Sequence, residues 1–237
     1  MDSILEGALG QGWADSAARP QVAELEFAGV HFFGGDPRHP LAPALVARLP
    51  ADSALPAGPP AWRNLLTRVH GPRLITLAVY DLDGRALDPA HLRRLAAAVP
   101  AGFRVERMGL EQARRVEADL QTEDHVHFFG SPEYFMACGI GFCALSGERI
   151  VCAASSGAVC SRGIEVQINT HPDFQHRGLA TAVSAALLAH CLERGLDPHW
   201  STRNPISLRL AKKLGYTLSG MSELQVLVAP LSAEQAL

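Results

Sequence analysis

The sequence lacks the features of nucleic-acid-binding and membrane-spanning proteins. Its 237 residues carry 21 Lys and Arg against 24 Asp and Glu, a net charge of -3, whereas nucleic-acid binders usually show a basic excess. No apolar run reaches the roughly 18 residues that a membrane span needs. The first ten residues have neither the basic nor the long apolar region of a signal peptide. We therefore expect a cytoplasmic protein that binds neither nucleic acid nor membrane.

Cysteine is sparse and shows no pairing pattern. The five cysteines are Cys138, Cys143, Cys152, Cys160 and Cys191. Zinc sites usually bring cysteines closer together in the sequence, so we expect reduced thiols that act as small core residues and no metal. His125 and His127 would share one face of a strand, but no third ligand stands at a suggestive spacing. Surface or turn histidines are the favoured interpretation.

Segments typical of strands alternate with segments typical of helices, which indicates a mixed α/β sheet. In the N-terminal part, strand patterns cover 22–36 and 73–84, and helix patterns cover 61–69 and 88–99. After these come strand patterns at 103–109, 139–147, 149–159, 163–170, 198–203 and 217–228, and helix patterns at 110–120, within 170–194 and from Asn204. We expect an α/β N-terminal segment, 1–102, and a second domain, 103–237.

Two similar stretches lie 96 positions apart, VHFFGGDP from Val30 and VHFFGSPE from Val126. A tandem duplication would explain them. The other reading is coincidence, since strands that end in aromatic residues before a glycine turn are common.

Acidic residues are absent from Phe174 to Leu192, although this stretch contains the start of a predicted helix. Helix starts usually gather Asp and Glu, because the exposed amides and the macrodipole favour negative charge. The loop Gln175–Ala180 would present such amides to a ligand. Gly178 would allow close approach, and Arg177 adds a positive charge. The loop is typical of an anion site, with a plain strand-to-helix turn as the alternative.

A second informative segment begins at Asn204. Asn204 and Pro205 are a strong N-cap and first-position pair, and Lys212, Lys213 and Gly215 mark the end of the predicted helix.

Together the two segments resemble the GNAT superfamily of acyl-CoA-dependent N-acetyltransferases. Gln175, Gly178 and Ala180 meet its Gln/Arg-x-x-Gly-x-Gly/Ala pattern, and N-x-x-S…LGY from Asn204 matches its later helix. GIGFCALSGERIV, HRGLATAVSAALLAHCLERGLDPHW and NPISLRLAKKLGY resemble the branch that contains the zwittermicin A resistance acetyltransferase.

The resemblance implies a GNAT acyltransferase fold at 103–237 and acetyl-CoA as co-substrate. The implied CoA-binding residues are Ile168, Asn169, Thr170, Gln175, His176, Arg177, Gly178, Leu179, Ala180, Thr181 and Asn204. The implied acceptor is an amine on a small molecule, and the branch likeness adds amine-bearing antibiotics as one class. The N-terminal segment, 1–102, is expected to form the acceptor-side wall. The oligomeric state is not indicated.

One position departs from the family pattern. Ala211 stands where many GNAT enzymes have a tyrosine that protonates the departing thiolate, and Tyr216 is expected to pack rather than react. For the general base the candidates are Glu165, on the polar face of the alternating strand, and His199, on the short strand before Asn204; ordered water is the third. Ala211 also supports an alternative function, a non-catalytic acyl-CoA-binding sensor or partner-binding module.

Overall fold

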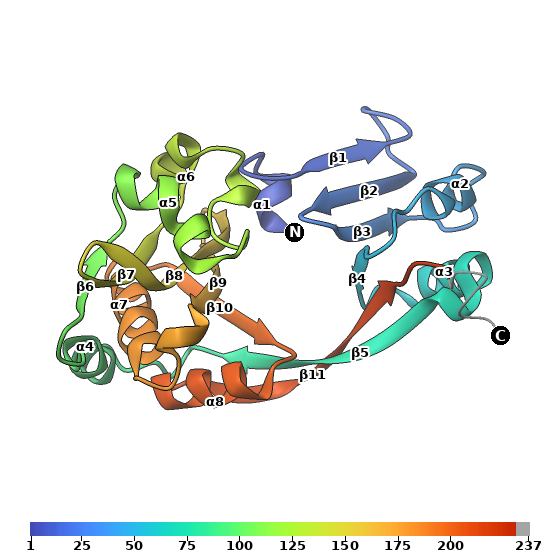
Figure 1. The fold of residues 1–237 in the computed structure, drawn as a ribbon. Helices are drawn as coiled ribbons and strands as arrows, with labels where there is room; N and C mark the ends of the chain where they lie inside the picture. Colours follow the sequence, from blue (N-terminus) through green and yellow to red (C-terminus); the bar gives the residue numbers. More distant parts are fainter. Residues whose placement is uncertain (231–237) are drawn as a thin grey trace. The chain divides into compact units, whose positions relative to one another are not determined.

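The structure is a computed structural model that describes residues 1–230, and the chain divides into two compact units. Unit 1 comprises Met1–Val79 and Met221–Leu237, and unit 2 comprises Tyr80–Gly220. Two long strands, β5 (Leu74–Asp83) and β11 (Thr217–Leu227), belong to both units (Figure 1). The domain boundary that we expect after residue 102 stays a prediction. Residues 80–102 lie in unit 2.

Unit 1 is a small sheet with helices packed on it. Its other elements are α1 (Asp2–Leu5), β1 (Gln11–Ala14), β2 (Val22–Phe27), β3 (Val30–Gly35), α2 (Ala42–Ala47), β4 (Ala54–Pro56), α3 (Pro60–His70) and η1 (Gly71–Arg73). The strands follow the order β1-β2-β3-β4-β11. Val22, Leu55 and Trp62 belong to a buried core formed between this sheet and α2 and α3. The strand pattern predicted at 22–36 is a hairpin, because the backbone turns at Ala28 and Gly29.

A partly buried ionic network centres on Glu24 in β2. The Glu24 carboxylate accepts a hydrogen bond from Nδ1 of His31 at 2.8 Å and another from Arg48. The side chains of Glu24 and His31 are each 7% exposed. Burial alone would raise the pKa of Glu24, but the hydrogen bonds and the positive charges of His31 and Arg48 together outweigh it, so the pKa of Glu24 lies below its usual value.

Unit 2 contains a mixed sheet in which β5 and β10 are neighbours, followed in order by β9, β8, β7 and β6. The strands are β6 (Arg104–Arg107), β7 (Gly141–Ser146), β8 (Arg149–Cys160), β9 (Gly163–Thr170) and β10 (Asp197–Thr202). The helices are α4 (Pro89–Ala97), α5 (Leu110–Leu120), α6 (Pro132–Cys138), α7 (Leu179–Glu193) and α8 (Pro205–Leu214), with the short turns η2 (His127–Phe129) and η3 (Pro172–Phe174). The mixed α/β fold predicted from the sequence is confirmed.

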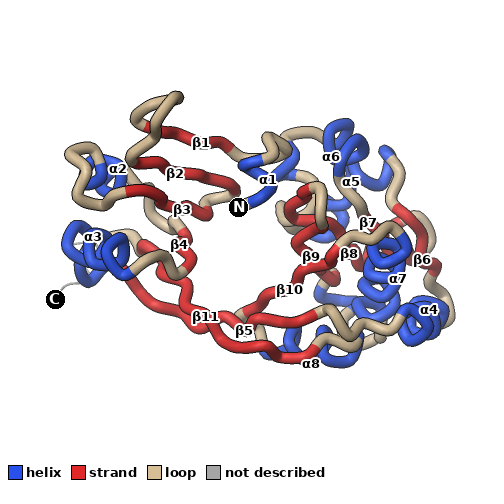
Figure 2. Tube along the Cα trace, turned by 180° about the vertical axis from the view of Figure 1, so that it is seen from behind, coloured by secondary structure: helices blue, strands red, loops and turns tan. Residues whose placement is uncertain are grey.

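Helices cover both faces of this sheet. Figures 1 and 2 show α5 and α6 on one side of β7 to β9 and α7 on the other. α7 also contacts α4 and α8, so it is enclosed almost all round, and its buried residues include Val183, Leu187 and Leu188. A helix enclosed in this way has no polar face. None of the helices in residues 1–230 is long and apolar enough to cross a membrane.

The two HFFG stretches adopt different structures. The first forms β3, whereas the second forms the 3-10 turn η2 after Val126. Their likeness is therefore confined to the sequence. His127 begins this turn, so the strand on which His125 and His127 would have shared a face does not exist.

Candidate active site

A wedge opens between β9 and β10 in the middle of the unit 2 sheet. The two strands pair in parallel at only three positions, the last of which joins His199 to Glu165. β9 continues to Thr170 against β8, and the rest of β10 pairs with β5 on its other side. In the described chain the edge of β9 that faces β10 therefore has no strand partner beyond Glu165. Unpaired strand backbone of this kind can pair with an extended ligand.

Two local features fix the point where the strands part. Gly163 allows β9 to lie very close to β10 at the paired end, since a Cβ there would lie 2.1 Å from the carbonyl oxygen of Asp197. On the other side of β9, the register of β8 shifts between Ser156 and Ala158, opposite Val166 and Glu165. A bulge of this kind bends its strand locally and is common beside active sites.

Glu165 and His199, the two residues predicted as base candidates, meet at this point. Nδ1 of His199 lies 2.5 Å from Oε2 of Glu165, and the hydroxyl of Ser201 donates to Oε1 of Glu165 at 3.1 Å. Both side chains are accessible, His199 at 55% and Glu165 at 40% exposure. Because a carboxylate can only accept, Nδ1 carries the proton, and Nε2 of a neutral His199 keeps a lone pair for a ligand.

The carboxylate also changes the acidity of the imidazole. The hydrogen bond to Glu165 raises the pKa of His199 above its usual value, and the negative charges of Glu165, Asp197 and Asp81 act in the same direction, against partial burial. His199 therefore becomes neutral, and able to accept a proton, at a higher pH than an isolated histidine.

A cavity of about 570 Å³ lies at the open end of the wedge, and we call it the loop cavity. It is lined by Ile168, Thr170, residues 174–181, Asn204, Ile206, Ser207, Arg209, Leu210 and Lys213. Ten of the eleven residues predicted to bind CoA are among these lining residues. None of the lining residues is Asp or Glu, while Arg177, Arg209 and Lys213 are cationic. The cavity is suited to an anion.

The loop before α7 has an unusual backbone. His176 and Gly178 both have positive φ, 59° and 83°, and the Gly178 position would leave a Cβ in open space. A non-glycine residue at positive φ carries strain that is often found at ligand-binding loops. Arg177 is held by a hydrogen bond to the carbonyl of Asp173 at 3.0 Å and lies 5.2 Å above the ring of Phe174.

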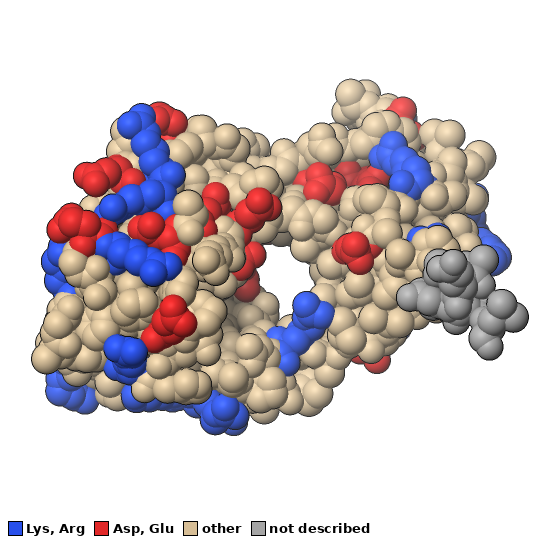
Figure 3. Space-filling view, viewed as in Figure 1, with Lys and Arg blue, Asp and Glu red and all other residues tan. Residues whose placement is uncertain are grey.

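α8 supplies the opposite wall of the loop cavity. Asn204 caps the helix as predicted, accepting from the amide of Ile206 at 2.8 Å. Arg209 and Lys213 are one turn apart and were not predicted as site residues, although their i, i+4 spacing would have indicated a shared face. Figure 3 shows Lys and Arg atoms over the segment that Figure 1 labels α8.

Asn169 is the predicted CoA-binding residue that does not line the cavity. Its amide donates to Asp124 at 3.1 Å and its carbonyl oxygen accepts from Gln167, also at 3.1 Å. Gln167 and Asn169 share the face of β9 that carries Glu165, since side chains alternate along a strand. Asn169 could therefore serve the loop cavity only through its backbone.

Two aromatic neighbours of the wedge have structural roles. Tyr216 is 3% exposed, its hydroxyl donates to the carbonyl of Pro198 at 2.5 Å, and burial raises its pKa. The ring of Trp200 packs edge-on against it, 5.6 Å away, and its indole nitrogen donates to Ser207 at 3.0 Å. Ala211 is fully buried. The Tyr216 hydroxyl is already engaged with the backbone and is poorly suited to donate a proton to a departing group.

The two histidines considered for a metal site do not form one. Burial lowers the pKa of His125 to about 4, and its Nδ1 lies 2.8 Å from the hydroxyl of Ser155. Across residues 1–230 there is no group of three His, Cys, Asp or Glu side chains arranged to hold a metal ion.

Comparisons with known proteins agree with this architecture. The GNAT acetyltransferase family matches residues 1–223. An uncharacterised N-acetyltransferase of Bacillus subtilis, YdfB, is 32% identical over 112 residues, which are 44% of this chain and 43% of the relative. This match therefore spans less than half the length of the relative.

Solved structures extend the likeness over most of the chain. A GCN5-related N-acetyltransferase-like protein from Streptococcus suis has a TM-score of 0.81 at 28% identity, covering 94% of this chain and 90% of its own. A GCN5-related N-acetyltransferase from Kribbella flavida has a TM-score of 0.60 at 15% identity, covering 88% of each chain, which is a likeness of fold alone.

Proposed function

Because this chain belongs to the GNAT acetyltransferase family, we propose that it transfers an acetyl group from acetyl-CoA to an amine of a small molecule. The observation that carries the proposal is the wedge. The unpaired edge of β9 leads from the loop cavity, which has cationic residues and no carboxylate in its lining, to the hydrogen-bonded side chains of Glu165 and His199.

In this proposal the loop cavity holds the CoA arm. The amides at the start of α7 receive the diphosphate, as exposed helix N-termini commonly do, and Arg177, Arg209 and Lys213 add formal positive charge. The free edge of β9 from Val166 to Thr170 pairs with the amide groups of the pantetheine arm. This arrangement directs the thioester towards Glu165 and His199.

The acceptor amine needs a base. An alkylamine resembles lysine, with a pKa of ~10.4, so only about one molecule in 2,500 is neutral at pH 7. Nε2 of His199 takes the proton of the amine, and Glu165 stabilises the imidazolium that forms. The amine nitrogen then forms a bond to the acetyl carbon while the bond from that carbon to sulfur breaks, and the nitrogen loses its second excess proton to water, which leaves a neutral amide. A thiolate leaves whose conjugate acid has an ordinary pKa of ~8.5, so water can protonate it where Ala211 offers no acid.

A thiol-release screen over small amines, aminoglycosides, polyamines and peptides tests the proposal. Calorimetry with acetyl-CoA is run in parallel. We expect binding of acetyl-CoA and release of thiol that depends on an added amine. Binding of acetyl-CoA without thiol release in the presence of any acceptor would favour the second candidate function, an acyl-CoA-binding sensor or partner-binding module. Ala211 supports this alternative.

Two narrower expectations belong to the same proposal. One is that amine-bearing antibiotics are among the acceptors, which rests on the resemblance to the zwittermicin A resistance branch. The other is that residues 1–102 wall the acceptor side. The screen addresses the first through its antibiotic members.

A further inference from the structure

A second cavity touches His199 from the paired end of the wedge. It has a volume of about 690 Å³, and its lining includes Asp83, Arg85, Leu87, Leu192, Asp197 and His199. All these residues belong to unit 2. We call it the strand-end cavity. The loop cavity lies at the open end of the wedge, so His199 is accessible from a space that the proposed CoA site does not use.

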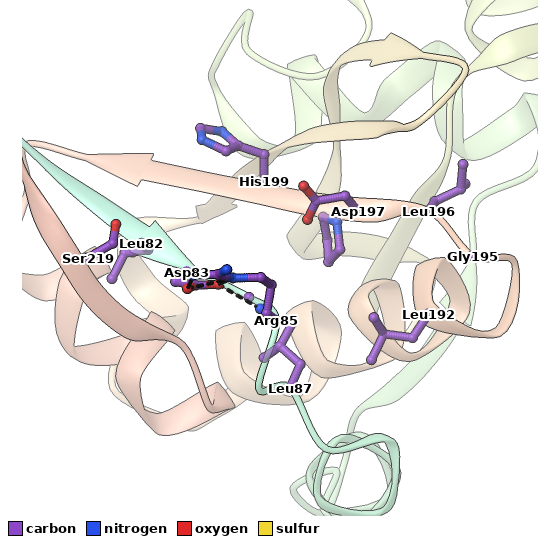
Figure 4. Close-up of a pocket in the computed structure, with 12 residues that line it drawn as sticks. Leu82, Asp83, Arg85, Leu87, Leu192, Gly195, Leu196, Asp197, His199 and Ser219 are labelled. Carbon is purple, nitrogen blue, oxygen red and sulfur yellow. Dashed lines mark hydrogen bonds and ion pairs between the residues drawn. The ribbon is translucent and has the colours of Figure 1, made fainter.

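The charges of the strand-end cavity do not balance. Asp83 is neutralised by Arg85, which donates to both of its oxygens, and this holds the pKa of Asp83 at about 2. Glu165 is engaged by His199 and Ser201. The carboxylate of Asp197 has no hydrogen bond or ion pair within residues 1–230, and Figure 4 shows it on the strand that carries His199, apart from the dashed ion pair of Asp83 and Arg85. The cavity thus offers one unmatched negative charge.

The spacing of Asp197 and His199 along β10 sets the length of a ligand that could contact both side chains. Asp197 and His199 are two residues apart on β10, so their side chains leave the same face of the strand from Cα atoms that are roughly 7 Å apart. A chain of four or five carbon atoms between two nitrogens has a similar length, because each C–C bond is about 1.5 Å long and advances a little less in an extended chain.

We propose that the strand-end cavity binds the acceptor, and that the acceptor is a linear aliphatic diamine or polyamine with four or five carbon atoms between its nitrogens. One nitrogen lies at Nε2 of His199 and is acetylated, and the second stays protonated and forms an ion pair with Asp197. This inference rests on the proposed function and specifies its substrate.

The test compares acceptors that differ only in the second charge. Initial rates of thiol release are measured with diaminobutane and diaminopentane, with butylamine and pentylamine, and with diamines of three and eight carbon atoms. We expect the four- and five-carbon diamines to exceed the monoamines in kcat/KM by about 10-fold, the low end for a hydrogen bond to a charged group. The shorter and longer diamines should lose most of this advantage.

Asp197→Asn then identifies the residue responsible. It should reduce the ratio of kcat/KM for the diamine to that for the monoamine to about 1, mainly through KM. Glu148→Gln is the matched control, because Glu148 is 81% exposed at the turn between β7 and β8 and lines neither cavity. It should leave the ratio unchanged.

The outcomes separate this inference from the proposed function. Thiol release with monoamines and diamines at equal efficiency would overturn the inference and leave the acetyltransferase standing. A diamine preference that survives in Asp197→Asn would overturn the role of Asp197. Absence of thiol release with every amine, at intact acetyl-CoA binding, would overturn the proposed function itself.

Discussion

At the scale of single residues, the hydrogen bond between His199 and Glu165 is the feature that favours our proposal of an acetyltransferase over that of an acyl-CoA sensor. A sensor of acyl-CoA needs the loop and the wedge, but it does not need an accessible imidazole with an oriented lone pair. The carboxylate fixes the tautomer of the imidazole and favours its protonated form, which is the form that general-base catalysis generates.

His199→Gln should lower kcat/KM by at least roughly 100-fold, the low end for acid–base catalysis, because glutamine cannot take a proton from the amine. Steady-state kinetics with the best acceptor from the screen measures this effect. Acetyl-CoA binding by calorimetry serves as the control and should be retained. A variant with near-normal turnover would leave ordered water as the base.

Glu165→Gln should move the acidic limb of the pH profile of kcat/KM to lower pH. The limb reports the pKa of His199, which Glu165 raises above its ordinary value of 6.5. When that cause is removed, the neutral imidazole persists to lower pH, so activity survives further into the acidic range even though its maximum falls. Profiles of the wild type and variant, recorded between pH 5 and 9, would contradict the assignment if their acidic limbs coincided.

At the scale of elements, the start of α7 shows how far the sequence predicted the site. The loop residues Gln175 to Thr181 are contiguous, so their pattern and the missing acidic residues predict an anion site from the sequence alone. All of them line the loop cavity, and the bound anion stays a prediction. Most of the acid-free run has a second cause, since α7 is buried on nearly every side. Only its first turn, which lines the loop cavity, needs the proposed anion to explain the lack of Asp and Glu.

Contacts between distant segments were less accessible to prediction. Glu165 and His199 could be proposed singly, but their hydrogen bond depends on a parallel pairing across 34 residues. Ser201 gave no sequence signal of its own, because its role exists only beside Glu165. The short strands β1 and β4 were missed for a related reason. They are four and three residues long, and no periodic pattern is visible over such a length.

Gly178→Asp should abolish detectable acetyl-CoA binding while the fold is retained. The new carboxylate would lie at the helix start, where the anion is proposed, and would repel it. The positive φ adds local strain, so circular dichroism and Gly178→Ala, which adds strain without charge, separate the two effects. Binding that is lost equally in both variants would attribute the effect to backbone strain.

In unit 1, Glu24→Gln should reduce the free energy of unfolding by about 2 kcal/mol at neutral pH, because the neutral amide weakens two hydrogen bonds to a buried charge. The pKa of Glu24 is lowered in the folded protein, so its contribution is complete above the unfolded pKa and disappears as pH falls through the folded value. Urea unfolding at pH 7 and pH 3 measures both effects. Glu223→Gln, at an exposed ion pair with Arg63, is the matched control, and an equal loss in this variant would contradict the role of burial.

At the scale of the whole molecule, the chain passes between the two units within the long strands β5 and β11, and not through a linker segment. Both strands pass from one unit to the other, so the C-terminal strand belongs partly with the N-terminal residues. The sequence predicted each strand but contained no signal for this return, because pairing partners far apart in the chain leave no local pattern. Every residue that lines the loop cavity or the strand-end cavity lies in unit 2.

The cysteines allow the opening of unit 2 to be measured. All five lie in this unit as free thiols. Cys143, Cys152 and Cys191 are fully buried, and burial raises the pKa of each to about 12. A thiol reagent therefore reaches them only when the unit opens. When opening and closing are fast relative to labelling, the labelling rate reports the population of the open state.

Acetyl-CoA should slow the labelling of these three buried thiols by about 100-fold at a concentration of 100 times its Kd. A ligand that binds only the closed unit stabilises it by roughly 2.7 kcal/mol under this condition. Acetyl-CoA has no free thiol and does not consume a maleimide reagent, and mass spectrometry identifies the labelled cysteines. The Gly178→Asp variant should show no protection at the same concentration. Equal labelling rates with and without acetyl-CoA in the wild type would contradict binding within unit 2, whereas protection confined to the wild type would link the loop cavity to the stability of the unit that contains it.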